Sequence, residues 1–204
     1  MMQANAIVNL HDQLTIDWHA APAHAGSVPV TGWLPTVGLQ HRANFDLWHI
    51  EDEARTPGAS DTELACVKRR VDSTNQLRND LAEQLDHILI DWLAARELPN
   101  PAAPLHSESP GLVIDRLSIM ALKIYHTREE ADRPDAPPGH AERNRDRLAI
   151  LVEQRADLAH CLDSLWQETL LGARRFKLYR QLKMYNDPSL NPAIYRKSAT
   201  DLSS

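Results

Sequence analysis

Apolar residues recur every three or four positions along most of the chain, which is the spacing of one face of an α-helix rather than of a strand. Prolines and glycines interrupt this pattern in four stretches, at residues 22–32, 56–60, 98–111 and 133–140. None of the 13 prolines falls inside a predicted helix interior. The remaining pattern predicts helices near residues 4–20, 36–55, 61–96, 110–130, 141–171 and 174–185. We therefore expect an all-α fold, a single bundle of about six helices.

The length of 204 residues suits one domain with a core of its own. We expect a single helical domain over 1–204, with an N-terminal helix and loop over 1–39 and a flexible tail over 193–204. Cys66 and Cys161 show no pairing pattern, which favours free thiols and a cytoplasmic location. The first residues lack the basic start and apolar run of a signal peptide, and no stretch is apolar enough to span a membrane.

The segment 110–130 is apolar almost all round, which predicts a helix in the interior of the bundle. Ser109 and Pro110 mark its start, because a serine hydroxyl can cap free amides and proline suits the first helical position. Charged or titratable residues nevertheless lie among the apolar ones, including Asp115, Arg116, Lys123 and His126. Buried charges need partners, so these residues call for a polar ligand or for an internal ion-pair network that fixes the helix register.

Two other predicted helices carry polar stripes. The stripe on 36–55 consists of Asn44, Trp48, Glu51, Asp52 and Arg55. It suits the wall of a pocket, or a tryptophan covering the end of the bundle beside surface ion pairs. The stripe on 61–96 consists of Lys68, Asp72, Asn75, Asn79, Glu83 and Asp86. An ordinary solvated helix face has the same pattern, although asparagines are poor helix formers that such a face does not require.

The net charge of −6 argues against general binding to nucleic acid, whose affinity comes from many lysines and arginines. Basic residues gather between 174 and 197, however. The predicted helix 174–185 and the residue after it combine aromatic, basic and amide groups, including Arg180, Lys183, Tyr185 and Asn186. This mixture suits stacking and anion binding. An amphipathic closing helix that docks on the acidic body is the other interpretation.

Common catalytic and nucleotide-binding motifs are absent, among them GxxxxGK[ST], HExxH and GxSxG. Glu153, Asp157 and His160 share a helix face but lack the second ligand set of a helical di-metal site. The carboxylates of Glu51, Asp52, Asp80 and Glu83 imitate a magnesium site without its ExxE spacing. We therefore predict neither a metal site nor a cofactor.

Four blocks of the sequence carry a resemblance to a known family: NFDLWHIEDEAR, VKRRVDSTNQLRND, SESPGLVIDRLSIMALKIYH and YRQLKMYNDPSLNP. In this order, over residues 40–192, they resemble the bacterial family catalogued as domain of unknown function 4254. The family pattern has Thr at the place of Ser109, and either hydroxyl can cap a helix. The resemblance implies a bacterial protein whose relatives are sometimes associated with glycosyltransferases of surface-polysaccharide pathways. It identifies no catalytic residue.

Together these observations predict a polar cavity between helices 36–55, 61–96, 110–130 and 174–185 that binds an anionic small molecule, a sugar phosphate or a nucleotide sugar. The candidate acids and bases are Asp52, Asp72, Asp115 and His126. The candidate ligand-binding residues are Trp48, Glu51, Arg55, Lys68, Asn75, Asn79, Arg116, Lys123, Arg180, Lys183, Tyr185 and Asn186. The alternative is a non-catalytic accessory module that binds a partner protein such as a glycosyltransferase. The reaction and the oligomeric state stay open.

Overall fold

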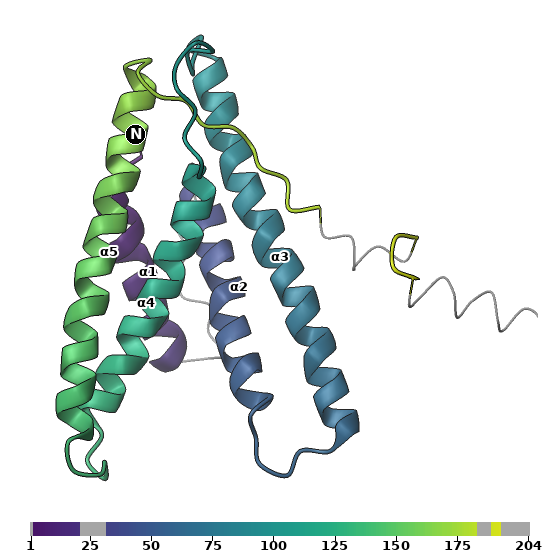
Figure 1. The fold of residues 1–204 in the computed structure, drawn as a ribbon, viewed down its shortest axis with the longest axis vertical. Coiled ribbons are helices and arrows are strands. Elements are labelled where there is room, and N and C mark those ends of the chain that lie inside the picture. The colour runs from purple at the N-terminus through teal and green to yellow at the C-terminus, as the bar shows by residue number, and fades with distance from the viewer. Residues whose placement is uncertain (1, 21–31, 183–188, 193–204) are drawn as a thin grey trace, which may run out of the picture.

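The computed structural model describes residues 2–20, 32–182 and 189–192, and these residues form five helices (Figure 1). The helices are α1 (Ala4–Ala20), α2 (Leu34–Glu53), α3 (Asp61–Ala94), α4 (Pro110–Asp132) and α5 (His140–Leu170). The prediction of an all-α bundle is confirmed. The first five predicted helices agree with the observed ones to within two residues at each end. None of the described helices has a stretch long and apolar enough to cross a membrane.

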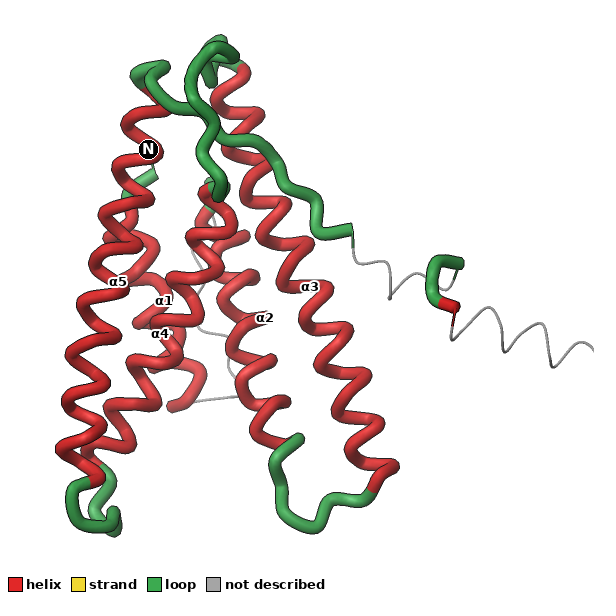
Figure 2. Tube along the Cα trace, viewed as in Figure 1, coloured by secondary structure: helices red, strands yellow, loops and turns green. Residues whose placement is uncertain are grey.

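The five helices form two pairs, α4 with α5 and α2 with α3, and α1 packs against both pairs. The helix α4 packs most extensively against α5, and α2 packs most extensively against α3, while α1 contacts α4, α2 and α5. In Figure 1, α3 and α5 converge at one end of the molecule and diverge toward the other, with α2 and α4 between them. The loop after α3 and the chain after α5 meet at the convergent end (Figure 2).

The core consists of two apolar clusters at different levels of the bundle. The larger joins all five helices and includes Ile7, Val37, Leu85, Leu89, Leu93, Val113, Ile114, Leu117, Leu162 and Trp166. The smaller joins only α1, α2 and α4 and includes Leu14, Trp18, Phe45 and Leu122. On each of these three helices the smaller cluster lies C-terminal to the larger one, so α1, α2 and α4 run in parallel past a layer between the clusters.

The start of α4 is fixed by a residue of α3 rather than by Ser109 alone. Ser109 occupies the capping position, but its hydroxyl does not bond to the α4 amides. It donates instead to the carboxylate of Asp86, which also accepts the backbone N–H of Gly111 at 2.7 Å. Burial raises the pKa of Asp86 to about 6, against the lowering effect of these two hydrogen bonds. The buried carboxylate on the polar face of α3 therefore locks two helices together.

The predicted helix at 174–185 is wrong over residues 174–182, which are extended and irregular. Gly172 ends α5 with a φ of +70°, a conformation that glycine adopts without strain. The chain then pairs with the loop before α4, since Arg175 N–H donates to Pro104 O at 3.0 Å and His106 N–H donates to Arg175 O at 2.7 Å. Phe176 is buried at 3 % exposure and anchors the segment. The segment therefore docks on the bundle as an extended chain, and its aromatic and basic residues do not mark a helix face.

Replacement of Gly111 by alanine tests the close contact between α3 and α4. A Cβ atom at this position would lie 2.3 Å from the carbonyl oxygen of Ala82, so the two helices would have to separate. We expect Gly111→Ala to lower the free energy of unfolding by about 3 kcal/mol, measured by urea denaturation.

The control is Gly58→Ala, at a loop position with φ +81° and nothing within 4 Å of the added Cβ. Backbone strain alone should cost about 1 kcal/mol there. Equal losses in the two variants would show that the packing of α4 on α3 is not tight.

Candidate functional site

A layer of buried polar side chains separates the two apolar clusters of the core. It comes from successive turns of α1, α2 and α4, and every member is at most 3 % exposed: His11, Thr15, Gln40, His41, Asn44 and Ser118. Buried polar groups are usually hydrogen-bonded. Here Thr15, His41, Asn44 and Ser118 are hydrogen-bonded, whereas both ring nitrogens of His11 and Oε1 of Gln40 have no partner among the described residues. Their hydrogen bonds therefore show what holds the site in place.

The directions of these hydrogen bonds follow from one donor. The hydroxyl of Thr15 gives its single proton to the carbonyl of His11 at 2.8 Å, so its oxygen accepts from Nε2–H of His41 at 2.9 Å. Burial lowers the pKa of His41 to about 3, and a neutral ring protonated at Nε2 carries a lone pair at Nδ1. That atom accepts from the hydroxyl of Ser118 at 2.7 Å, and Ser118 accepts from Asn44 Nδ2 at 2.9 Å.

Asp115 ends this chain of hydrogen bonds on the side of α3. Its Oδ1 accepts from Asn44 Nδ2 at 2.9 Å and from Gln40 Nε2, and it lies 3.7 Å from Nε of Arg78. The Asp115 side chain is 16 % exposed. Burial raises its pKa, while Arg78 and the two amides act in the opposite direction. The requirement that buried charges of this helix find partners on other helices is thus met for Asp115.

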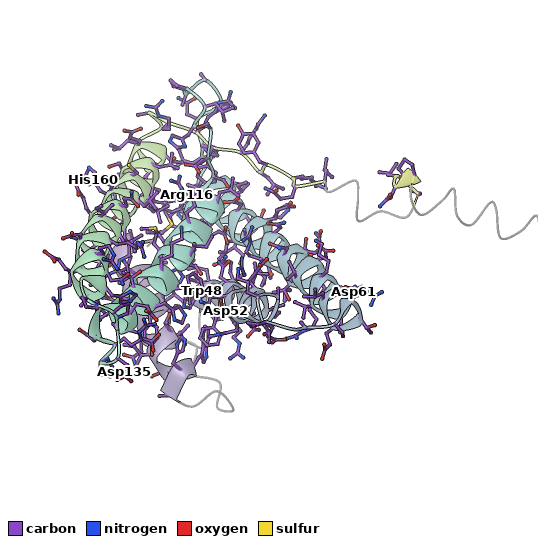
Figure 3. The ribbon with its side chains drawn as sticks, turned by 60° about the horizontal axis from the view of Figure 1, so that its bottom comes forward. Trp48, Asp52, Asp61, Arg116, Asp135 and His160 are labelled. Carbon is purple, nitrogen blue, oxygen red and sulfur yellow. The ribbon has the colours of Figure 1, made fainter. Side chains whose placement is uncertain are left out.

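A pocket of about 320 Å³ opens beside Asp115, between α2, α3 and α4. Its lining residues are Asn44, Leu47, Trp48, Glu51, Asp52, Arg55, Arg78, Ile119 and Leu122. Figure 3 shows Trp48 and Asp52 together on α2. The interpretation of the polar stripe on α2 as a pocket wall agrees with this geometry, because all five residues of that stripe line the pocket.

The predicted residues of α3 and α4 are divided between several environments. His126 of α4 stacks on the indole of Trp48, with ring centres 4.7 Å apart. Asn79 is buried on the inner face of α3, with Asn75 half-buried one turn earlier. Asp72 pairs with the exposed Lys68 within α3, and neither lines the pocket beside Trp48.

Arg116 and Lys123 lie on the other side of α4, away from Trp48. Arg116 is exposed and pairs with Glu108 at 2.8 Å. Both basic residues line a second hollow of about 530 Å³ between α4 and α5, with Asp157 opposite them. Figure 3 shows Arg116 apart from Trp48. The structure therefore does not bring these two cations to the same pocket as Trp48, because residues on opposite sides of one helix face different neighbours.

The remaining predicted residues belong to the chain after α5. Arg180 is exposed on the extended segment. The backbone N–H of the next residue, Gln181, donates to Glu83 of α3 at 2.7 Å, so the segment reaches α3. Lys183, Tyr185 and Asn186 lie outside the described residues, as does the predicted tail 193–204.

One group of side chains with metal-ligating atoms occurs within the part of the chain that the structure describes. It consists of His19, His49 and His126, whose ligand atoms all lie within 4.8 Å of one another. The acids and histidine considered from the sequence, on α5 and between α2 and α3, do not gather into such a group among the described residues.

Sequence reasoning missed Arg78, His41, Ser118, His19 and His49. Arg78 belongs to one of the family-like blocks, and its place one turn before Ala82 on the inner face of α3 was a usable signal. The other four residues lie on α1, α2 and α4, where each has apolar neighbours in the sequence. Periodicity averages over single residues of this kind, so no local pattern marks them.

The described residues form an all-helical fold with a pocket between α2, α3 and α4. The chain belongs to the family described as "Protein of unknown function (DUF4254)", whose model matches residues 35–178. The resemblance to this family is confirmed, and the match contains the first three of the four sequence blocks, whereas the fourth, at residues 179–192, lies beyond it. Neither the curated proteins nor the solved structures include a match to the chain. The matched region contains the whole pocket, whereas α1 precedes it.

Acidification tests the buried neutral histidine at the centre of the polar layer. Because the pKa of His41 falls from 6.5 to about 3 on folding, His41 binds a proton in the unfolded chain but not in the folded protein between these two pH values. The stability that this group contributes is complete above pH 6.5 and is lost as the pH falls toward 3. We expect His41→Gln to remove up to about 1.4 kcal/mol per pH unit from the slope of unfolding free energy against pH.

The measurement is urea denaturation at several pH values between 7 and 4. The control is His160→Gln, at an exposed position of α5, which should leave the slope of the original protein unchanged. Parallel curves for the original protein and His41→Gln would contradict the buried neutral state of His41.

Proposed function

We propose that the pocket between α2, α3 and α4 binds a small anionic molecule of the sugar-phosphate class. The observation that carries this proposal is the state of Arg78. Its side chain is 24 % exposed and lines the pocket, and its Nε is buried without a hydrogen bond to any described residue. Asp115 lies 3.7 Å away, beyond hydrogen-bond distance. The buried Nε faces Asp115, so a ligand in the pocket would meet the other guanidinium nitrogens, whose planar arrangement matches phosphate oxygens.

The rest of the pocket suits the carbon skeleton and the hydroxyls of a sugar. Trp48, Leu47 and Ile119 provide apolar walls, and the flat indole can pack against the C–H face of a sugar ring. Glu51 and Asp52 lie on the same wall and can accept hydrogen bonds from hydroxyl groups. Arg55 is exposed at the rim and adds a second positive charge.

The size of the pocket separates the two ligand classes expected from the sequence. Its volume of about 320 Å³ is at the lower end of the range for small-molecule sites, roughly 300–1,000 Å³. A monosaccharide phosphate suits this volume better than a nucleotide sugar, which would extend beyond the walls. The resemblance found from the sequence implies sugar chemistry but does not distinguish these two ligand classes.

If the protein is an enzyme, Asp52 is the acid or base best placed to act. It is exposed and lines the pocket, so a bound ligand can reach its carboxylate. Asp115 lies behind Asn44 and Arg78, and Asp72 is engaged with Lys68. We therefore assign Asp115 to positioning Arg78 and Asn44 rather than to contact with the ligand.

The accessory-module alternative would need a continuous apolar face for a partner protein. Large apolar side chains that are at least half exposed occur on four different helices: Ile16, Leu39, Leu77 and Ile150. This distribution does not favour one docking face. The pocket gives the better-supported function.

Binding of sugar phosphates and of the matching free sugars, measured by calorimetry and thermal shift, tests the proposal. A specific ligand at 100 times its dissociation constant adds about 2.7 kcal/mol to the free energy of unfolding. We expect Arg78→Gln to weaken binding of the phosphorylated sugar at least about tenfold, because it removes a charged hydrogen-bond donor. Trp48→Ala should weaken binding of the phosphorylated and the free sugar alike.

Two matched variants complete the experiment. Arg55→Gln changes an exposed rim residue without disturbing the interior and should reduce the preference for the phosphorylated sugar. Arg116→Gln removes a cation from the other hollow and should leave affinity unchanged. A loss of affinity in Arg116→Gln without one in Arg78→Gln would move the site to the second hollow. An absence of binding across the panel would refute the proposal and favour the accessory module.

A further inference from the structure

Three histidines from three helices meet beside Trp48, and none of them lines the pocket. His19 comes from the last turn of α1, His49 from α2 and His126 from α4, and all three are half-buried. Their ligand atoms lie within 4.8 Å of one another. The rings of His19 and His126 have centres 5.0 Å apart, and those of His19 and His49 are 5.3 Å apart.

Hydrogen bonds at the outer edge of two rings determine which nitrogen is available. Nδ1 of His19 lies 2.7 Å from the carbonyl oxygen of Thr15, which can only accept, so Nδ1 carries the proton. Nδ1 of His126 lies 2.9 Å from a carboxylate oxygen of Glu129 and donates in the same way. In a neutral imidazole the lone pair is then on Nε2. A carbonyl or carboxylate behind the ring is the usual support of a metal-binding histidine.

The two Nε2 atoms that carry these lone pairs are buried and have no hydrogen-bond partner among the described residues. Leaving a buried acceptor without a hydrogen bond is unfavourable. Two such atoms in one cluster double this cost at a single place. A shared ligand that accepts both lone pairs removes it, and a metal cation has this property.

Aromatic side chains pack against all three rings. Tyr125 stacks on His19 at 4.2 Å and Trp48 stacks on His126 at 4.7 Å, while Phe45 meets His49 edge-on at 4.5 Å. Burial lowers the pKa of His49 and of His126, and the neighbouring His19 adds to this effect. Neutral imidazole is the form that binds metal ions, and the lowered pKa of His49 and of His126 favours that form.

We propose that His19, His49 and His126 form a binding site for a divalent transition-metal ion, in the first place zinc. Imidazole nitrogen is a preferred ligand of zinc, and three histidines leave a fourth position for water or a carboxylate. Asp52 is not one of the three grouped residues, but its charge acts on both His49 and His126 and it also lines the ligand pocket. His19 precedes the region matched by the family model, so the site does not depend on family membership.

Cobalt and zinc titrations of untagged, EDTA-treated protein test the site, because a histidine tag would itself bind metal. We expect one equivalent of Co²⁺ per chain, with the visible absorption of a four-coordinate ion, and its displacement by Zn²⁺. Each of His19→Gln, His49→Gln and His126→Gln should weaken binding by at least about a hundredfold. Glu129→Gln changes an exposed residue that only orients His126 and should weaken binding about 10- to 100-fold.

His160→Gln is the matched control, since this exposed histidine on α5 has Asp157 and Glu153 nearby in sequence. It should leave binding unchanged. Circular dichroism of each variant verifies that it folds. If one of the histidine variants does not fold, Glu129→Gln still tests the site. No stoichiometric binding, or binding that survives all three ring substitutions or depends on His160, would overturn the proposal. The titration contains no organic ligand, so its result is independent of the sugar-phosphate proposal.

Discussion

The level at which α1, α2 and α4 pass one another is buried, so the polar groups of Thr15, His41, Asn44 and Ser118 depend on hydrogen bonds to one another. The arrangement that results leaves little freedom. Thr15 determines the tautomer of His41, His41 determines the direction of the Ser118 hydroxyl, and Asn44 joins Ser118 to Asp115. A shift of any helix by one turn would leave several of these groups unsatisfied at once. The layer therefore sets the helix register, and Asn44 carries that register to the pocket.

Trp48 contacts both the pocket and the histidine cluster. One part of the indole lines the pocket that contains Arg78, and the ring stacks on His126 of the histidine cluster. Asp52 has the same double position, because it lines the pocket and acts electrostatically on two of the histidines. A bulky aromatic side chain at this place is thus explained by packing on both sides. It also places any ion held by the histidines close to a ligand in the pocket.

The orientation of α3 shows how tertiary packing overrides a local pattern. Its polar stripe resembles a solvated face, yet Asn79 and Asp86 are buried, while Leu77 is 52 % exposed. The reason is a specific partner: the carboxylate of Asp86 receives the Ser109 hydroxyl and the Gly111 amide at the start of α4. The chain after α5 behaves similarly. Its helix-like spacing yields to backbone pairing with residues 104–106 and to burial of Phe176.

The sequence by itself determined the five helices and their ends, because apolar spacing, prolines and glycines act within one or two turns of the chain. It also placed Trp48, Glu51, Asp52 and Arg55 on one side of a helix, since residues three and four apart share a face. Only the tertiary structure decided that Arg78 meets Asp115, that Arg116 turns to another hollow, and that His19, His49 and His126 come together. Those partners lie far apart in the chain, and the rotation of each helix about its axis depends on all its neighbours at once.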